Sequence, residues 1–266
     1  MVVSVPLQVY QAVVTSSYAL FFQVNSGVRQ EIKMDIIITD LTRFAKQDIV
    51  CIAGINPATN KCIRLLPYLP TNECRRLNIL PGAILHGNFT TPPTTAPHTE
   101  DRNYQGELSF KGPCTTESFI SILKATESSN AEDGFSVSFP TGQKHIPINT
   151  TPNKSIITLS VNPWDLSIVP DSFNPGKIKV IFSDKSGHEF RYLSITDLGF
   201  HNYAEKNSNG DNFSILNDFI RSQKEVYVRL GLSREFTSPD GRTGYWLQVN
   251  GIYTFPEYFS EIRCYA

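Results

Sequence analysis

Short apolar runs separated by turn residues recur along most of the chain after residue 34. Runs rich in Ile, Val and Leu occupy residues 35–41, 49–55, 61–66, 83–89 and 154–161. Residues 56–60, with the sequence NPATN, have the composition of a hairpin connection between the second and third runs. The pattern therefore predicts a first unit built mainly from short β-strands.

Two segments have helical spacing instead. In residues 115–125 the apolar positions Phe119, Ile120 and Leu123 fall at this spacing, and in residues 213–223 they are Phe213, Leu216 and Ile220. Segments of alternating apolar and polar residues lie on both sides of the second helix in the sequence. They predict one hairpin before it, with a DKSG turn at residues 184–187, and one after it, with a Pro-Asp-Gly turn at residues 239–241. Each half of the chain thus contains hairpin strands, a short helix and further strands.

This inventory predicts a mainly β fold of two OB-like small barrels with a few short helices. A β-sandwich would show more regular strand spacing and no such helices. We expect the first OB-like unit at residues 34–168 and the second at residues 169–266, both within the usual size of a domain. Residues 1–33 are expected to be an upstream extension outside the fold, or a peripheral anchor, and the sequence leaves open whether Met1 or Met34 is the true start.

Composition narrows the classes of function. The 266 residues include 24 basic and 25 acidic side chains, so no strongly cationic surface is expected, although a local basic groove is compatible with this balance. The five cysteines lack regular spacing, which favours free thiols in a reducing compartment. Neither a spanning segment nor a secretory signal is recognisable. We therefore expect a cytoplasmic protein with no membrane partner.

The last hairpin carries the candidate binding chemistry. Tyr227 and Arg229 alternate with apolar residues on its first strand, and Trp246, Gln248 and Asn250 do so on its second strand. Aromatic rings stack on bases, arginine contacts phosphate, and amides read base edges. We interpret these five residues as a contact face for single-stranded nucleic acid or a nucleotide. The alternative is that the other unit covers Trp246 and that a carboxylate pairs with Arg229.

Three further arginines are predicted to extend that face. Arg64 lies within an apolar strand, where a charge must find a partner or line a groove. Arg43 follows a strand and Arg234 lies in the last hairpin, so all three are candidates for phosphate contacts. A salt bridge to Asp40 or Glu73 is the structural alternative for Arg43 and Arg64.

A separate cluster points to an alternative function, metal-assisted catalysis. The Pro/Thr-rich segment at residues 90–102 is predicted to be an exposed loop, and it brings together His98, Glu100 and Asp101. These side chains suit a divalent ion or acid–base work, as in a metal-dependent nuclease or hydrolase. The alternative is that they cap a turn and pair with Arg102 or Lys111.

No complete catalytic or cofactor signature accompanies this cluster. The sequence contains no GxSxG, GxxxxGK[ST] or GxGxxG segment. We therefore expect a binding module without catalytic activity and without a cofactor. A protein-interaction scaffold anchored by Trp246 is a further alternative.

Several short blocks resemble one known family. They are ITDLTRF, VCIAGIN and CIRLL in the first half, and RYLSITDLGF, VYVRLGLSREF and YWLQVNGIYTF in the second. Together they resemble the dual OB-containing domain family of bacterial proteins, over residues 34 to about 259. The segment HTED at residues 98–101 also matches, but Arg102 stands where an aromatic residue is expected. The resemblance implies two OB-like barrels, a part in nucleic-acid-linked processes such as prokaryotic defence, and no established reaction. We expect a setting in a bacterial defence or repair operon, whose other proteins are candidate partners.

Overall fold

The computed structural model describes residues 31–44, 47–93, 96–140, 142–175, 177–207 and 211–263. Most of the predicted extension at residues 1–33 therefore lies outside the described residues, although Ile32 and Lys33 already belong to the first strand. Within the described residues, no helix is both long and apolar enough to span a membrane.

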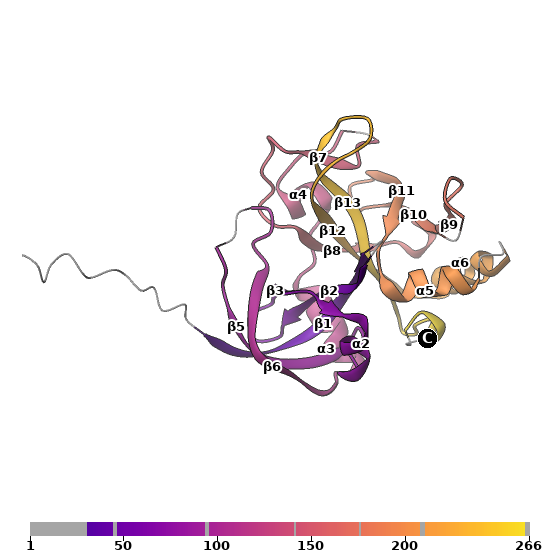
Figure 1. Ribbon diagram of the computed structural model, residues 1–266. Coiled ribbons are helices and arrows are strands. Elements are labelled where there is room, and N and C mark those ends of the chain that lie inside the picture. The colour runs from indigo at the N-terminus through magenta and orange to yellow at the C-terminus, as the bar shows by residue number, and fades with distance from the viewer. Residues whose placement is uncertain are drawn as a thin grey trace, which may run out of the picture. The chain divides into compact units, whose positions relative to one another are not determined.

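The first sheet closes on itself as a five-stranded ring (Figure 1). Its strands are β1 (Ile32–Phe44), β2 (Gln47–Asn56), β3 (Lys61–Leu66), β5 (Ala83–Thr90) and β6 (Asp101–Pro113). β1 pairs with β5 along its first half and with β2 along its second half, while β3 and β6 pair in parallel. A short strand β4 (Leu69–Pro70) and helix α2 (Thr71–Arg76) connect β3 to β5.

The second sheet repeats this connectivity with a broken first strand. Its strands are β8 (Ile156–Val161), β9 (Leu166–Pro170), β10 (Ile178–Ser183), β11 (Glu189–Ile195), β12 (Glu225–Thr237) and β13 (Thr243–Phe255). The turn η1 (Pro163–Asp165) divides β8, which pairs with β12, from β9, which pairs with β10. β11 and β13 pair in parallel, and helices α5 (Leu198–Lys206) and α6 (Asp211–Ser222) connect β11 to β12.

Both rings have the strand neighbours of an OB fold, in which the first strand contacts the second and fourth and the third contacts the fifth. The predicted fold class, two OB-like barrels with few short helices, is confirmed. The predicted boundary at residue 168 differs from the sheets, because β8 and β9 begin the second barrel at Ile156. Helix α5 was not predicted, since the strand pattern of the preceding hairpin was extended to Phe200 and a polar stretch was expected from Glu205.

The segment between the barrels contributes α3 (Thr116–Ala125), α4 (Ala131–Phe135) and β7 (His145–Pro147), and a last turn η2 (Ser260–Ile262) follows β13. The helix predicted at residues 115–125 is α3, and its capping residue Thr115 accepts a hydrogen bond from the Ser118 backbone. The segment at residues 130–145 contains α4, and β7 adds to the edge of β13.

Each barrel has its own apolar core, and a third cluster joins them. This junction cluster contains residues of β1, β2 and α3 together with aromatic residues of the second barrel, namely Ile37, Ile55, Phe119, Ile122, Leu123, Tyr227, Tyr253 and Phe255. The junction therefore buries one side of the last hairpin, and this decides which of its residues reach solvent.

Candidate nucleic-acid interface

Arg229 lies inside the junction between the barrels. Its side chain is 1% exposed and pairs with Asp40 of β1, with 2.8 Å between Nη2 and Oδ2. Its Nη1 donates to the Thr158 hydroxyl at 2.8 Å. Burial alone would lower the pKa of Arg229, but the adjacent Asp40 carboxylate outweighs it and raises that pKa. Arg229 is thus a paired, buried cation rather than a surface contact.

Two other predicted arginines meet at one carboxylate. Arg64 donates from Nε to Asp101 Oδ1 at 2.6 Å, and Arg234 donates from Nη2 to Asp101 Oδ2 at 2.9 Å. Arg64 is buried, whereas the side chain of Arg234 is 42% exposed. The partner of Arg64 is therefore Asp101, not the expected Asp40 or Glu73.

The cluster predicted as an exposed metal-binding loop is instead buried. His98, Glu100 and Asp101 are each at most 8% exposed. Glu100 Oε1 accepts hydrogen bonds from the backbone N–H groups of Ser155 and Ile156, and Oε2 accepts one from the Ser155 hydroxyl. The carboxylate oxygens thus face donors instead of an ion, and the described residues contain no group of three His, Cys, Asp or Glu placed to hold a metal.

His98 packs against the edge of the Tyr245 ring and makes no hydrogen bond among the described residues through either ring nitrogen. Burial, with the positive charges of Arg64 and Arg234, lowers the pKa of His98 to about 3. The ring is therefore neutral at physiological pH.

Tyr227, Asn250 and Arg43 also lie where the barrels meet. Tyr227 is 2% exposed and donates its hydroxyl to Glu225. Asn250 is 4% exposed, and its side-chain oxygen accepts hydrogen bonds from Thr196 and Gln248. The Arg43 backbone N–H donates to the Thr196 carbonyl, which brings the end of β1 across β11 and β13.

The predicted contact face is consequently divided. Asp40 and Thr39 of β1 contact Arg229 and Tyr253 of the hairpin, whereas Trp246 and Gln248 lie nearer the start of β13 and are partly exposed. Strand alternation places a residue on one face of a sheet, but it cannot show whether another barrel covers that face.

An open surface nevertheless exists on β10, β11 and β13. A β-bulge in β11 sets Arg191 and Tyr192 opposite the single residue Ile181, so the two consecutive side chains both point outwards. Tyr192 has φ +55°, a conformation that is rare for a bulky residue, and is 51% exposed. The bulge thus presents an aromatic ring in the middle of the second barrel's outer face.

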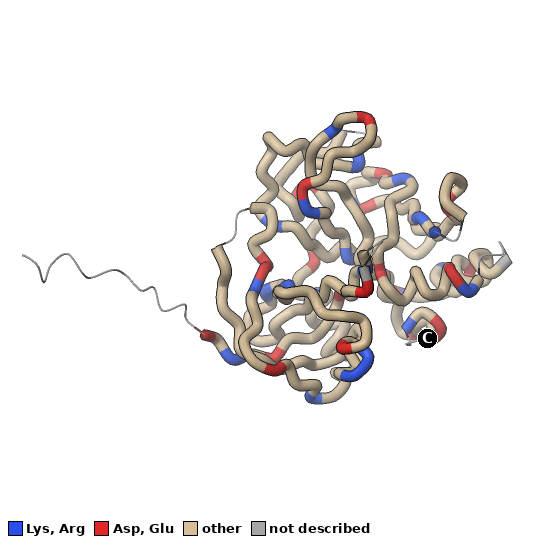
Figure 2. Tube along the Cα trace, in the orientation of Figure 1, with Lys and Arg blue, Asp and Glu red and all other residues tan. Residues whose placement is uncertain are grey.

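Two lysines lie beside that ring. Lys144 Nζ is 5.7 Å from the centroid of Tyr192. Lys179 donates to the Ser194 hydroxyl at 2.8 Å and also forms an ion pair with Asp171, with 3.5 Å between Nζ and Oδ2. Burial and the neighbouring Lys179 charge together lower the pKa of Lys144. Figure 2 shows the basic positions along β10 and β11, interspersed with acidic ones. The cationic character of this face is therefore local and modest.

The same face extends to Gln248, because Ser194 and Gln248 are paired residues of β11 and β13. Beyond it, Trp246 stacks on His145 of β7 with 4.9 Å between ring centroids, and the guanidinium of Arg242 lies 5.1 Å from the Trp246 ring. Trp246 Nε1 donates to the Phe236 carbonyl. These contacts hold the Trp246 ring in one orientation at one end of the face.

The loop that joins β9 to β10 carries another exposed aromatic ring, that of Phe173. Asp171 accepts a hydrogen bond from the Phe173 backbone at 3.0 Å, and Phe173 is 92% exposed. We define the open face as Lys144, Phe173, Lys179, Arg191, Tyr192, Ser194, Trp246 and Gln248.

In OB folds, ligands bind on the second and third strands between the loops that join strands one to two and four to five. Those strands are β10 and β11 in the second barrel, so the open face occupies this position. In the first barrel they are β2 and β3, and their residues Ile55, Cys62 and Arg64 contact the second barrel. Only the second barrel offers this surface among the described residues.

The sequence contains a signal for the bulge at Tyr192. Phe190 and Leu193 are both buried although they are three residues apart, which breaks the period of two. Arg191 and Tyr192 lie between these two apolar residues, and both carry a polar group. Such a pair in place of a single outward-facing residue indicates a bulge. The lysines at positions 144 and 179 had no comparable signal, since only the pairing of distant strands brings them together.

Comparison with known proteins supports the architecture. The sequence model of a family described as the dual OB-containing domain matches residues 34–252, which include both barrels up to the second half of β13. None of the curated proteins matches the chain.

Proposed function

The chain belongs to the dual OB-containing domain family, and from this premise we propose that its second barrel binds single-stranded nucleic acid on the open face. The observation that carries the proposal is the bulge that presents Tyr192, with Lys144 beside the ring, on the strands that OB barrels use for ligands.

The roles follow from ordinary chemistry. Tyr192 and Phe173 offer exposed ring faces on which bases can stack, and each stacked base contributes about 1–3 kcal/mol. Lys144 and Lys179 contact phosphates, while the Gln248 amide hydrogen-bonds a base edge. Trp246, held by His145 and Arg242, limits the face at one end.

The arginines of the junction have an indirect part in this proposal. Arg229 and Arg64 fix the first barrel against the second, so that β1 crosses β13 and leaves β10 and β11 open. Arg234 pairs with Asp101 at the border of this junction. Unlike Arg64 and Arg229, its side chain is partly exposed to solvent. We also propose a setting in a bacterial defence or repair process, with partners from the same operon. This part of the proposal rests on the family resemblance alone.

The test is fluorescence anisotropy of labelled single-stranded DNA and RNA of about 12 nucleotides, a length within the site sizes of OB folds. With two phosphate contacts, raising the salt from about 50 to 200 mM should weaken binding about sevenfold. Tyr192→Ala and Lys144→Ala should each weaken binding, whereas Lys111→Ala, on β6 of the first barrel, is the matched control.

Absence of binding to either strand would refute the proposal. Binding of a neutral oligosaccharide without salt dependence would also refute it, because OB barrels use the same face for sugars.

A further inference from the structure

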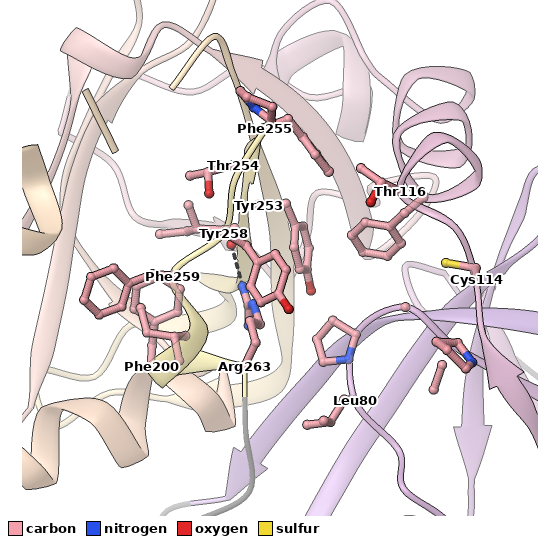
Figure 3. Close-up of a pocket in the computed structure, with 18 of the residues that line it drawn as sticks. Leu80, Cys114, Thr116, Phe200, Tyr253, Thr254, Phe255, Tyr258, Phe259 and Arg263 are labelled. Carbon is pink, nitrogen blue, oxygen red and sulfur yellow. Dashed lines mark hydrogen bonds between the residues drawn. The ribbon is translucent and has the colours of Figure 1, made fainter. Parts of the chain in front are cut away.

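A pocket of about 410 Å³ lies beyond Asn250 along β13, where the two barrels and α3 meet (Figure 3). It is lined by Asn78 and residues 80–83 at the start of β5, by the start of α3, by α5 and α6, and by residues between Ile252 and Arg263. Small-molecule sites commonly occupy about 300–1,000 Å³ and often form between domains. None of its lining residues belongs to the open face, so this pocket is a separate feature.

Aromatic rings form one wall of the pocket. They are Phe200, Phe219, Tyr253, Phe255, Tyr258 and Phe259, all from the second barrel, while Phe119 of α3 and Phe110 of β6 line the first-barrel side. Phe119 and Tyr253 meet edge to face, with centroids 5.0 Å apart. Tyr258 is 65% exposed at the rim, so a bound molecule would cover a ring that otherwise faces water. This wall suits a flat, unsaturated ligand.

The pocket has no unpaired charge among its described lining residues. Arg263 is the charged side chain of the lining, and its Nη1 lies 2.9 Å from Asp197 Oδ2. The guanidinium also lies 4.7 Å from the centroid of Tyr253. An ionic ligand would lose its hydration here without gaining a counter-charge. The ligand should therefore be neutral.

Polar groups lie on the side opposite the aromatic wall. Thr116 and Cys114 line the pocket from the first-barrel side, and Figure 3 shows them across from Phe200 and Phe259. Asn78 also lines the pocket and carries a side-chain amide. A hydroxyl and an amide recognise ring nitrogens and carbonyl oxygens rather than a hydrocarbon edge.

We propose that this pocket binds a neutral, planar heteroaromatic molecule of the size of a nucleobase or nucleoside. The ring stacks in the aromatic wall, and its polar edge meets Thr116 and Asn78. Since the site shares no residue with the open face, it stands whether or not the open face binds nucleic acid.

The experiment uses adenosine as the probe, with calorimetry and saturation-transfer NMR on the full chain. Adenosine should bind saturably, ribose should not bind, and adenosine monophosphate should bind no more tightly than adenosine. Tyr258→Ala should weaken adenosine binding about tenfold, in line with the loss of one stacking ring. Thr116→Trp should abolish binding, because it fills the mouth of the pocket at an exposed position without changing the core.

The control variants separate this site from the open face. Tyr192→Ala should leave adenosine binding unchanged, and Tyr258→Ala should leave oligonucleotide binding unchanged. The proposal is overturned if adenosine, guanosine, cytidine and uridine all fail to bind the wild-type chain. It is also overturned if Thr116→Trp melts like wild type yet still binds adenosine, or if Tyr192→Ala alone removes that binding.

Discussion

Asp40 of the first barrel and Arg229 of the second form an ion pair in which each side chain is 1% exposed. The Arg229 Nε and Nη2 groups both donate to Asp40, and Nη1 donates to Thr158 of β8. Burial of either charge without the other would cost several kcal/mol. The pair therefore fixes how β1 lies across the second barrel, and with it which strands remain open.

Replacing Arg229 alone should be strongly destabilising. Arg229→Met leaves the buried Asp40 without its cation, and the free energy of unfolding should fall by about 3–5 kcal/mol. Denaturant unfolding followed by tryptophan fluorescence measures this change. The double variant Asp40→Leu with Arg229→Met should recover most of the loss, because it replaces the charged pair with apolar side chains.

The exposed pair Arg191–Glu189 provides the control for that prediction. Its side chains are 63% and 42% exposed, so Arg191→Ala should change the free energy of unfolding by less than about 1 kcal/mol. Equal losses for Arg191→Ala and Arg229→Met would show that the junction pair contributes no more than a surface pair.

His98 should make stability fall in mild acid. Its folded-state pKa is about 3, below its ordinary value of about 6.5, so between these values the unfolded chain binds a proton that the folded chain does not. The contribution is complete above pH 6.5 and is lost as the pH falls towards 3, at about 1.4 kcal/mol per pH unit.

Denaturant unfolding between pH 6 and pH 4.5 tests this dependence. His98→Phe should unfold with a pH slope smaller than that of wild type by about 1.4 kcal/mol per unit. Identical slopes for the two proteins would mean that His98 is protonated as readily in the folded state as in the unfolded state.

The sequence predicted the barrels because their information is local. The strands at residues 49–55 and 61–66, the NPATN turn and the helix at 115–125 each follow from periodicity and turn chemistry within a few residues. The boundary between the units could not be predicted in the same way. The sequence indicates a strand at β8, but only its pairing with β12 shows that this strand belongs to the second barrel.

The candidate site was predictable only in part, because it depends on which faces the two barrels cover. Alternation separated Arg229 from Leu230, but the covering element, β1, lies almost 200 positions earlier in the chain. The proline-rich segment likewise suggested exposure, yet Glu100 is held by the Ser155 and Ile156 backbone amides. Long-range packing of this kind has no signature in a single strand.

Tyr192 should contribute binding at the expense of stability. Its left-handed backbone conformation is strained for a side chain with a Cβ atom, and glycine would relieve that strain. Tyr192→Gly should therefore leave the free energy of unfolding unchanged or raise it by up to about 1 kcal/mol. The same variant should bind single-stranded oligonucleotide about tenfold more weakly, because it loses one stacking ring.

Parallel anisotropy and denaturation measurements on Tyr192→Gly decide this prediction. Loss of stability together with loss of binding would indicate that the ring acts through packing. Phe236→Ala is a suitable comparison, since Phe236 is 55% exposed but lies outside the open face.

Gly231 of β12 should be required because Asn250 of β13 packs directly over it. A Cβ atom at position 231 would lie 2.4 Å from Asn250 Nδ2, closer than real contacts allow. Gly231→Ala should therefore lower the free energy of unfolding by about 1–3 kcal/mol, because Asn250 must move away from the Thr196 hydroxyl. A double-mutant cycle isolates this contact. In an Asn250→Ala background the added methyl group meets no amide, so Gly231→Ala should cost clearly less there than in wild type. An equal cost in both backgrounds would assign the effect to the backbone of β12 and not to the packing of Asn250.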